Sequence, residues 1–514
     1  MAWEARPCTQ DRPCTLVRVS PLFERILIAN RGEIAVRIAH TCRAMGIPTV
    51  AVYSEADRSS LHVREADVAV AIGAAEPERS YLNADLLIDA ARKAGCDAVH
   101  PGYGFLSQNA GFADAVAGAG LAFIGPPGDV HRRMGDKRAA RRLMTAAGVP
   151  VLPGYEGDDQ ADATLAAEAA RIGWPVLVKP ARGGGGKGMH IVRGADELTA
   201  ALAASRREAR GAFGDDSLIL ERFVERPRHV EVQVLADTHG ATVHVFEREC
   251  SIQRRHQKVI EETPSPALSP TQRAGLLEAG VAAARAASYV NAGTVEMLLA
   301  PDGGFYFLEM NTRLQVEHPV TEMVTALDLV RLQIEIAAGR PLPFAQADLA
   351  ARGHAIECRV YAEDADDLPS AGPVLHHAWP AGPGVRVDAG IATGSEIGIH
   401  YDPLLAKIVT VGRDRDESLE RMQAALRSTV ILGVETNVAR LQRVIEHPAF
   451  RRGELDTGFL ERHASDLAVP SEAPPEAIAA AFAVLGAAPA QAGGPGPAAL
   501  ADPWSTLGGW RLGA

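Results

Sequence analysis

The sequence predicts an α/β protein with an N-terminal doubly wound, Rossmann-like domain, a small glycine-rich domain and a C-terminal α+β domain. Short apolar strands alternate with helical stretches from about residue 25, which is typical of repeated βα units around a parallel sheet. Two strand-like segments then bracket a run of glycines, and a longer mixed region follows. With 514 residues the chain is too long for one compact core.

The first domain is predicted from residue 22 to residue 130. Residues 25–29 form a short apolar strand, and Ile34, Ile38 and Cys42 then recur at helical spacing. Residues 47–53 form a second strand. Residues 1–21 lack the apolar stretch of a secretory signal, so we expect a disordered extension there.

The second domain is predicted from residue 131 to residue 225, with a linker helix near 137–147. Strands at 175–179 and 189–192 bracket the glycine run 182–188 and suggest a hairpin. The run is not a Walker loop, because Gly188 stands where that loop needs Ser or Thr. It is either a flexible loop or a phosphate cover, in which glycine N–H groups approach phosphate oxygens and Lys187 adds charge. Lys179 precedes it on the strand and can reach the same phosphates.

The third domain is predicted from residue 226 to residue 468, with a helix at 417–429 near its end. Residues 469–514 are rich in Pro, Ala and Gly and indicate a linker with one helix at about 476–487. Trp504 and Trp510 lie in a stretch too short to bury them, which suggests the start of a further domain.

Composition excludes several classes of protein. The net charge of −12 argues against sequence-independent nucleic-acid binding. Six cysteines with no CxxC pattern indicate a reducing compartment, and no run of 18 apolar residues predicts a membrane span. We expect a bacterial cytoplasmic location, with the mitochondrial matrix as the less favoured alternative. Only six of the 52 basic residues are lysines, which reflects either a GC-rich genome or positions that need a compact ammonium.

Two carboxylates are the clearest candidates for metal ligands. Strand-like segments around Glu296 and Glu309, joined by the turn 301–304, predict a hairpin that places the two side by side. Adjacent carboxylates repel unless a cation lies between them, and two carboxylates with the Asn311 carbonyl suit Mg²⁺. The alternative is a salt-bridged strand face.

The following residues predict an anion site. Arg313, Gln315 and Glu317 alternate onto one face if the backbone stays extended, and an arginine fork beside an amide suits a small planar oxyanion. The segment 247–258 is either a charged hairpin or a basic patch, and it favours a local phosphate site over nucleic acid. We expect Cys250 to be structural or to line a site.

Together these segments resemble the biotin carboxylase component of biotin-dependent carboxylases, an ATP-grasp enzyme. The resemblance runs from about Phe23 to His463. It rests on the motifs at residues 28–35, 100–107, 134–137, 182–189, 228–234, 253–258, 309–322 and 401–404. It implies a nucleotide bound between the small domain, which acts as a lid, and the C-terminal domain.

The resemblance also implies site residues. For ATP they are Lys137, Lys179, Gly184, Gly185, Gly186, Met189, Glu221, Val224, His229, Gln253, His256 and Leu298. For the metal they are Glu296, Glu309 and Asn311, and for bicarbonate Arg313, Gln315, Val316 and Lys258. Glu317 matches the general base, and Arg359 matches the arginine that stabilises the biotin enolate. The implied catalytic set is Glu317, Arg359, Lys258 and Arg313.

The implied reaction is a ligase half-reaction with ATP, Mg²⁺ or Mn²⁺, and carrier-bound biotin. Bicarbonate is phosphorylated to carboxyphosphate, and the released carbon dioxide carboxylates biotin. The chain is most similar to α-subunits of 3-methylcrotonyl-CoA carboxylase, an enzyme of leucine breakdown, through residues 151–160 and 371–376. One departure changes a charge, since Gln108 stands where the family usually has Glu.

The implied partners are a biotinyl carrier domain and a carboxyltransferase β subunit, in a homodimer or a larger α/β assembly. No Met-Lys-Met motif is present and Lys407 is the last lysine, so we expect biotin on another polypeptide or on a missing C-terminal region. Three alternatives stay open: the same half-reaction in a geranyl-, propionyl- or acetyl-CoA carboxylase, another ATP-grasp ligase, and a nucleotide-binding regulatory or scaffold subunit.

Overall fold

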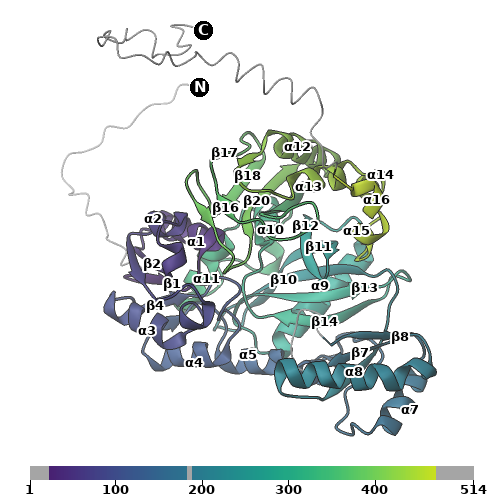
Figure 1. Cartoon of the computed structure of the whole chain (residues 1–514). Coiled ribbons are helices and arrows are strands. Elements are labelled where there is room, and N and C mark those ends of the chain that lie inside the picture. Colours follow the sequence, from purple (N-terminus) through teal and green to yellow (C-terminus); the bar gives the residue numbers. More distant parts are fainter. Residues whose placement is uncertain (1–21, 182–187, 470–514) are drawn as a thin grey trace, which may run out of the picture. The chain divides into compact units, whose positions relative to one another are not determined.

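The computed structural model describes residues 22–181 and 188–469. The predicted N-terminal extension, the glycines 184–186 and the predicted 476–487 helix lie outside these ranges. Contacts group residues 1–468 into one unit and residues 469–514 into another. Figure 1 follows the chain from the N-terminal sheet to the large sheet that holds the candidate site.

The N-terminal region contains the predicted parallel sheet. Its strand order is β3-β2-β1-β4-β5, and every pairing is parallel. The strands are β1 (Ile26–Ile28), β2 (Thr49–Tyr53), β3 (Val68–Ala71), β4 (Ala98–His100) and β5 (Ala122–Phe123). The longer helices are α1 (Gly32–Ala44), α3 (Ala84–Lys93) and α4 (Ala110–Gly118). Shorter ones are η1 (Glu55–Asp57), α2 (Leu61–Glu65) and η2 (Pro77–Arg79).

Helices cover both faces of this sheet because its central strand is apolar on both sides. Ile26 and Ile28 pack with α1, whereas Leu27 packs with α3 and α4. A strand buried on two faces reads as a continuous apolar run, as residues 26–28 do. The predicted doubly wound arrangement is therefore correct.

A four-stranded antiparallel sheet forms the small glycine-rich region. Its order is β6-β9-β7-β8, and β7 and β8 form the predicted hairpin. The strands are β6 (Gly154–Tyr155), β7 (Val176–Pro180), β8 (His190–Val192) and β9 (Leu218–Arg222). The helices here are α7 (Asp162–Ile172) and α8 (Ala195–Phe213), and α5 (Gly128–Gly135) and α6 (Lys137–Ala146) precede the sheet.

The large sheet has eight strands in the order β14-β13-β10-β11-β12-β15-β20-β18. Its first five strands in sequence are β10 (Arg228–Ala236), β11 (Thr242–Arg254), β12 (Gln257–Thr263), β13 (Asn291–Leu299) and β14 (Phe305–Asn311). The others are β15 (His354–Tyr361), β18 (Val385–Ala389) and β20 (Leu404–Gly412). Two short pairs lie outside it: β16 (Gly372–Pro373) with β19 (Glu396–Ile397), and β17 (His376–Ala378) with β21 (Val430–Leu432).

The two faces of the large sheet differ in character. One packs apolar side chains against α9 (Pro270–Ala286) and α12 (Arg415–Ser428), with Val232 and Ile356 in the two clusters. The other face carries charged side chains under α10 (His318–Thr325). Remaining helices are α11 (Leu329–Ala337), η3 (Gln346–Asp348), α13 (Val438–Glu446), α14 (Pro448–Arg451), α15 (Phe459–Arg462) and α16 (Ala464–Leu467). This division places the candidate site on the charged face.

Candidate active site

A row of charged side chains crosses four neighbouring strands of the large sheet. Arg248 on β11 lies opposite Glu231 on β10, Glu231 lies opposite Glu296 on β13, and Glu296 lies opposite Glu309 on β14. The predicted hairpin is therefore present and places the two candidate metal ligands in register. Arg248 Nε lies 2.6 Å from a Glu231 oxygen, and both side chains are fully buried. Three adjacent carboxylates need cations beside them.

Lys258 supplies one of those cations. Its Nζ lies 2.5 Å from Glu231 Oε2, 2.8 Å from Glu296 Oε1 and 2.6 Å from Glu317 Oε1. Burial lowers the pKa of Lys258, but the three carboxylates outweigh it and hold the pKa well above its usual value. The ammonium is charged at neutral pH and links the carboxylate row to Glu317.

Glu317 lies one residue before α10, not on a strand. Strand β14 ends at Asn311, so the condition for alternation of residues 313–317 onto one face, an extended backbone, is not met. The chain turns into α10 instead, and Pro319 occupies the first turn of the helix, where its missing N–H leaves no donor unpaired. Glu317 is still brought to the site, because its Oε2 lies 3.0 Å from Nη2 of Arg359 on β15.

The Glu317 carboxylate is held ionised. Burial raises the pKa of Glu317, but Lys258, Arg359 and Arg248 together hold it well below the ordinary carboxyl value. Its side chain is fully buried, so these charges act with little solvent screening. A buried, ionised carboxylate can accept a proton from a bound acid.

Arg313 and Gln315 form the predicted fork beside an amide. Arg313 Nη1 donates to Gln315 Oε1 at 2.8 Å, and Gln315 Nε2 donates to Glu296 Oε1 at 3.0 Å. Asn311 Nδ2 donates to the same Glu296 oxygen at 2.8 Å. The candidate anion-binding groups therefore lie directly beside the carboxylate row.

The oxygen donors of Glu296, Glu309 and Asn311 fit a hard divalent cation. Glu296 and Glu309 lie in direct register, and the Glu309 carboxylate accepts no hydrogen bond from the described residues. His229 Nε2 lies 3.3 Å from Glu296 Oε2. Mg²⁺ prefers one or two carboxylates and completes its shell with water or phosphate oxygens, which this set allows.

Two lysines, on β7 and at the start of α6, form a candidate polyanion site. Lys179 on β7 lies with its Nζ 2.5 Å from Glu221 Oε2, and Glu221 also lies 3.1 Å from Arg141 Nη1. Lys137 begins α6. Burial and then the neighbouring Lys179 ammonium lower the pKa of Lys137. Two ammoniums close enough to repel each other attract a ligand with several negative charges.

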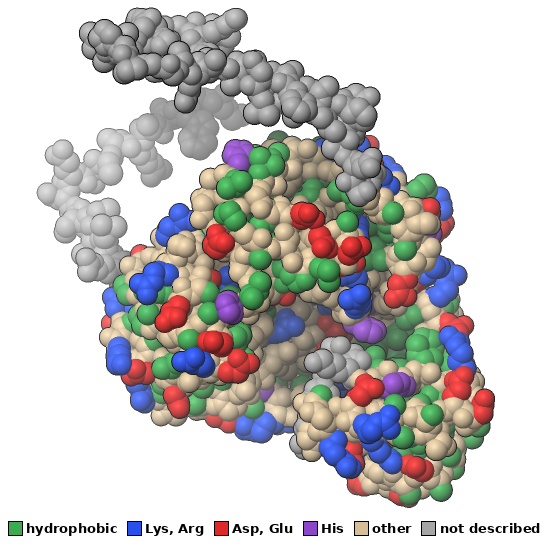
Figure 2. Space-filling model, in the orientation of Figure 1, with side chains coloured by type: hydrophobic (Ala, Val, Ile, Leu, Met, Phe, Trp, Pro, Cys, Tyr) green, Lys and Arg blue, Asp and Glu red, His purple; other side chains and the backbone are tan. Residues whose placement is uncertain are grey.

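The other predicted nucleotide residues are scattered around this site. Val224 lines a cavity of about 360 Å³ with Leu152 and Tyr306. Gln253 Nε2 lies 3.0 Å from His229 Nδ1. Met189 and Leu298 are half-buried, and His256 is exposed at the tip of the β11–β12 hairpin. Figure 2 shows a hollow at the centre of the face drawn, with charged side chains inside it.

A separate cavity of about 320 Å³ lies beside the fork. Arg313, Val316 and Arg359 line one side of it, and Tyr103 and Tyr401 line another. A guanidinium facing a cavity with aromatic walls suits a flat, partly polar ligand.

Of the two alternatives for the segment 247–258, the structure shows the charged hairpin, formed by β11 and β12. The segment is mostly buried and is not a basic surface patch: Arg248 and Cys250 are fully inaccessible. Several buried charges of the site have no counterpart among the sequence predictions. Glu231 was not singled out, although its position between Val230 and Val232 is a usable signal. A charge alternating with valines lies on the opposite face from them.

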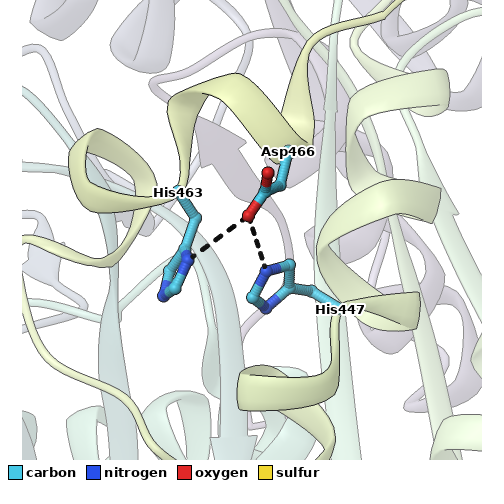
Figure 3. A group of neighbouring side chains, drawn as sticks. All are labelled: His447, His463 and Asp466. Atoms are coloured by element: carbon cyan, nitrogen blue, oxygen red, sulfur yellow. Dashed lines mark ion pairs between the residues drawn. The ribbon is translucent and has the colours of Figure 1, made fainter.

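A second cluster, formed by His447, His463 and Asp466, lies far along the chain from these groups (Figure 3). His447 Nε2 is 3.6 Å and His463 Nδ1 is 4.0 Å from Asp466 Oδ2. His447 Nδ1 accepts a hydrogen bond from the Ala449 N–H, so in the neutral ring the proton sits on Nε2. Nε2 therefore faces Asp466 as a donor and has no free lone pair for a metal.

Within the described residues no helix is both long and apolar enough to cross a membrane.

Three family models match the chain. They are the biotin carboxylase N-terminal domain at residues 22–130, the carbamoyl-phosphate synthase L chain ATP-binding domain at 136–345 and the biotin carboxylase C-terminal domain at 357–462.

The chain is similar to characterised proteins over most of its length. It is 47% identical to the mitochondrial methylcrotonoyl-CoA carboxylase subunit alpha of Dictyostelium discoideum, covering 96% of this chain and 71% of that protein. The counterpart of Mus musculus is 50% identical, over 86% of this chain and 62% of its own length. The biotin carboxylase of Halalkalibacterium halodurans is 49% identical, over 86% of this chain and 98% of that protein.

A solved structure has the same fold. It is the biotin carboxylase domain dimer of the Hydrogenobacter thermophilus 2-oxoglutarate carboxylase, in complex with MgADP, ADP and bicarbonate. The TM-score is 0.84 at 42% identity, covering 87% of this chain and 99% of that one.

Proposed function

Because this chain belongs to the biotin carboxylase family, we propose that it catalyses the ATP- and bicarbonate-dependent carboxylation of biotin, with release of ADP and phosphate. The observation that carries the proposal is the position of Lys258. Its ammonium contacts Glu296 of the candidate metal site at 2.8 Å and Glu317, the candidate base, at 2.6 Å. One side chain, Lys258, therefore connects the candidate metal site, where the phosphates of ATP would bind, with the candidate base, which would take the proton of bicarbonate.

The first step is assigned to the fork and the base. Arg313, Gln315 and the Val316 backbone hold bicarbonate, and Glu317 accepts its proton as a bicarbonate oxygen attacks the γ-phosphorus of ATP. The new P–O bond gives carboxyphosphate, and the bond to the bridging oxygen of ADP breaks. Lys258 balances the charge that develops on the transferred phosphoryl group.

The nucleotide is assigned to the space between the small sheet and the large sheet. Lys137, Lys179 and His229 bind its phosphates. The adenine is assigned to Glu221, Val224, Met189 and Leu298, and further nucleotide contacts to Gln253, His256 and the glycines 184–186. Glu296, Glu309 and Asn311 would hold Mg²⁺ or Mn²⁺, which when bound neutralises phosphate charge.

The second step is assigned to the 320 Å³ cavity. The C–O bond of carboxyphosphate breaks and gives carbon dioxide and phosphate. A ureido nitrogen of biotin bonds to the carbon dioxide, and the released phosphate takes up the proton of that nitrogen. Arg359 faces the cavity and stabilises the negative charge that develops on the ureido oxygen. Arg359 also contacts Glu317 at 3.0 Å. The same guanidinium is therefore assigned to both steps: it contacts the base of the first step and stabilises the charge on biotin in the second.

The first prediction tests the base. Glu317→Gln keeps the size of the side chain but cannot accept a proton, so we expect bicarbonate-dependent ADP release to fall by about 10²-fold or more. The measurement is steady-state ADP formation with free biotin and with bicarbonate added or withheld. Nucleotide affinity, measured by titration calorimetry with MgADP, should stay near wild type. An unchanged rate would remove Glu317 from the mechanism.

We further propose that the acyl-CoA acceptor is 3-methylcrotonyl-CoA and that the chain works with a biotinyl carrier domain and a carboxyltransferase β subunit. The similarity to methylcrotonoyl-CoA carboxylase alpha subunits at 47–50% identity supports this acceptor. The chain covers 62% of the mouse relative's length. The assay is run with a biotinyl carrier domain added. The substrate is identified by a competition assay with the carrier and the β subunit added. The assay offers 3-methylcrotonyl-, geranyl-, propionyl- and acetyl-CoA together and measures which of them is carboxylated.

A homodimer is the proposed minimal assembly, since the Hydrogenobacter relative is a dimer. We also propose a reducing compartment, the bacterial cytoplasm. Its support is that Cys42, Cys96, Cys250 and Cys358 are buried free thiols. Light scattering of the purified chain and fractionation of the native host test the two proposals.

A further inference from the structure

Behind Arg359 lies a pair of buried carboxyl groups that the proposed reaction does not use. Glu261 on β12 is the direct cross-strand partner of Glu357 on β15. Both side chains are completely buried. Glu357 and Arg359 are two residues apart on one strand, so they share the sheet face that α10 covers.

The hydrogen bonds of this pair are incomplete. Glu261 Oε1 lies 2.6 Å from Arg359 Nε and 2.5 Å from Arg359 Nη2. Glu261 Oε2 and both oxygens of Glu357 have no hydrogen-bond partner among the described residues. A buried carboxylate without partners is strongly disfavoured, and two ionised carboxylates opposite each other repel.

The surrounding charges do not neutralise Glu357. The nearest cations are Lys407 on β20 and Arg359, but Arg359 is engaged by Glu261 and Glu317, and Lys407 by Glu33 at 2.9 Å. The Val316 carbonyl also accepts a hydrogen bond from Lys407, at 2.9 Å.

Helix α10 adds no charge that can reach Glu357. Its His318 Nδ1 contacts the Gln315 carbonyl at 2.8 Å, and its Glu322 pairs with Arg37 and Arg386. The neighbouring negative charges are those of Glu261 and Glu317. Burial raises the pKa of Glu357 well above its usual value and that of Glu261 to about 7. The shift of Glu357 favours a bound proton at neutral pH, and that of Glu261 brings its pKa to neutral pH.

We propose that Glu261 and Glu357 share one proton, that the neutral carboxyl of Glu357 donates it to the free oxygen of Glu261, and that Glu357 is thereby a positioning residue for Arg359. The proposal rests on the proposed roles of Arg359 and Glu317. With one proton the pair carries a single negative charge, which Arg359 balances while it still reaches Glu317. Loss of that proton gives the carboxyl pair a second negative charge. The two negative charges then draw the Arg359 guanidinium toward the pair and away from Glu317 and the biotin cavity.

The proton itself is tested without any turnover. Infrared spectra of the full chain should contain the C=O stretch of a protonated carboxylic acid, and Glu357→Gln should remove that band. Glu262→Gln is the matched control: Glu262 is the next residue on β12, buried but ionised beside Arg415 and His354, so its loss should leave the band in place. A wild-type spectrum identical to that of E357Q in this region would overturn the proposal.

The positioning role is tested by a pH profile of kcat/KM for free biotin. E357Q keeps a donor that cannot ionise, so the alkaline limb should move to higher pH. Glu357→Leu removes the donor and should lower kcat/KM at least tenfold across the range, about 1.4 kcal/mol of transition-state stabilisation. Equal losses in both variants with an unmoved alkaline limb would show that Glu357 only fills space. A wild-type chain without bicarbonate- and biotin-dependent ADP release would refute the proposed function instead. The infrared spectra would still test the shared proton, because they need no turnover.

Discussion

Two cations hold the carboxylate of Glu317, the proposed general base, and weaken it as a proton acceptor. Lys258 and Arg359 lie 2.6 and 3.0 Å from its two oxygens, and the pKa of Glu317 is well below the ordinary carboxyl value. A general base works best when its pKa lies near the pKa of the group from which it takes the proton. Phosphate oxygens placed beside Lys258 would share its ammonium and so raise the pKa of Glu317. In the proposed mechanism, the strength of the proposed base would therefore depend on occupancy of the proposed nucleotide site.

Glu262 is a buried carboxylate that contributes to folding stability and not to the proposed reaction. Arg415 of α12 contacts it through Nε at 2.6 Å and Nη2 at 3.0 Å, and His354 Nε2 lies 2.6 Å away. Burial alone would raise the pKa of Glu262, but these donors lower it from 4.5 to about 2. The folded-state pKa is depressed, so this stabilisation is present above about pH 4.5 and is lost as the pH falls toward 2.

The second prediction follows from that window. Glu262→Gln should lower the free energy of unfolding by about 3 kcal/mol at neutral pH, which is the free-energy equivalent of the pKa shift. The difference from wild type should shrink once the pH drops below about 4.5, because Glu262 of the unfolded wild-type chain then takes up a proton while the folded carboxylate stays ionised down to about pH 2. Urea unfolding of both proteins at a series of pH values measures it. A difference that stays constant down to about pH 3 would mean that Glu262 acts through packing alone.

At the scale of elements, helix α9 depends on one glycine. A Cβ at Gly280 would lie 2.6 and 2.8 Å from two atoms of Val232, which is fully buried on β10. Neither the strand nor the branched side chain can move aside without disturbing the cluster between the helix and the sheet. Gly275, in the same helix, would place a Cβ 3.7 Å from Phe305, an ordinary contact distance.

The third prediction uses this matched pair. Gly280→Ala should destabilise the protein by about 1–3 kcal/mol through overpacking. Gly275→Ala should stabilise it by about 0.5–1 kcal/mol, because alanine has the higher helix propensity. Thermal and urea unfolding of the two variants provide the comparison. If both substitutions shift stability in the same direction, propensity and not helix–sheet spacing governs this helix.

Local patterns predicted the elements that carry the ligands but not the contacts between them. The hairpin that places Glu296 against Glu309 follows from two strands and a Pro-Asp-Gly-Gly turn within about fifteen residues. The contact of Glu261 with Arg359 spans 98 residues of sequence, and neither residue stands out locally. The chain does not stay extended after Asn311, so the start of α10, and not strand alternation, sets the position of Glu317.

At the scale of the whole molecule, Lys407 joins the N-terminal sheet region to the large sheet. It lies on β20, it is fully buried, and its Nζ is 2.9 Å from Glu33 Oε1 in the first turn of α1. The hydroxyl of Tyr103 donates to the other oxygen of Glu33, and both of those residues line the proposed biotin cavity. The sequence drew attention to Lys407 through the scarcity of lysine and to Glu33 through the motif at residues 28–35, but nothing in it paired the two residues.

The last prediction tests this connection. Lys407→Met removes the cation and leaves Glu33 buried without its ion-pair partner, so we expect a loss of roughly 3–5 kcal/mol in the free energy of unfolding. Partners raise the pKa of Lys407 despite its burial, so its contribution is complete at neutral pH and is lost only as the pH rises above the ordinary lysine value. Urea unfolding near pH 7 therefore reports the full effect.

Two variants make that measurement decisive. Lys93→Met removes a lysine that is 73% exposed and pairs with Asp89 at 2.5 Å on the surface of α3, and it should change stability by less than about 1 kcal/mol. Adding Glu33→Gln to Lys407→Met removes the stranded charge, so the double variant should recover part of the loss. If Lys407→Met costs no more than Lys93→Met, the ion pair with Glu33 does not hold the two regions together. If the double variant is as unstable as the sum of the two single variants, the lysine and the glutamate act independently.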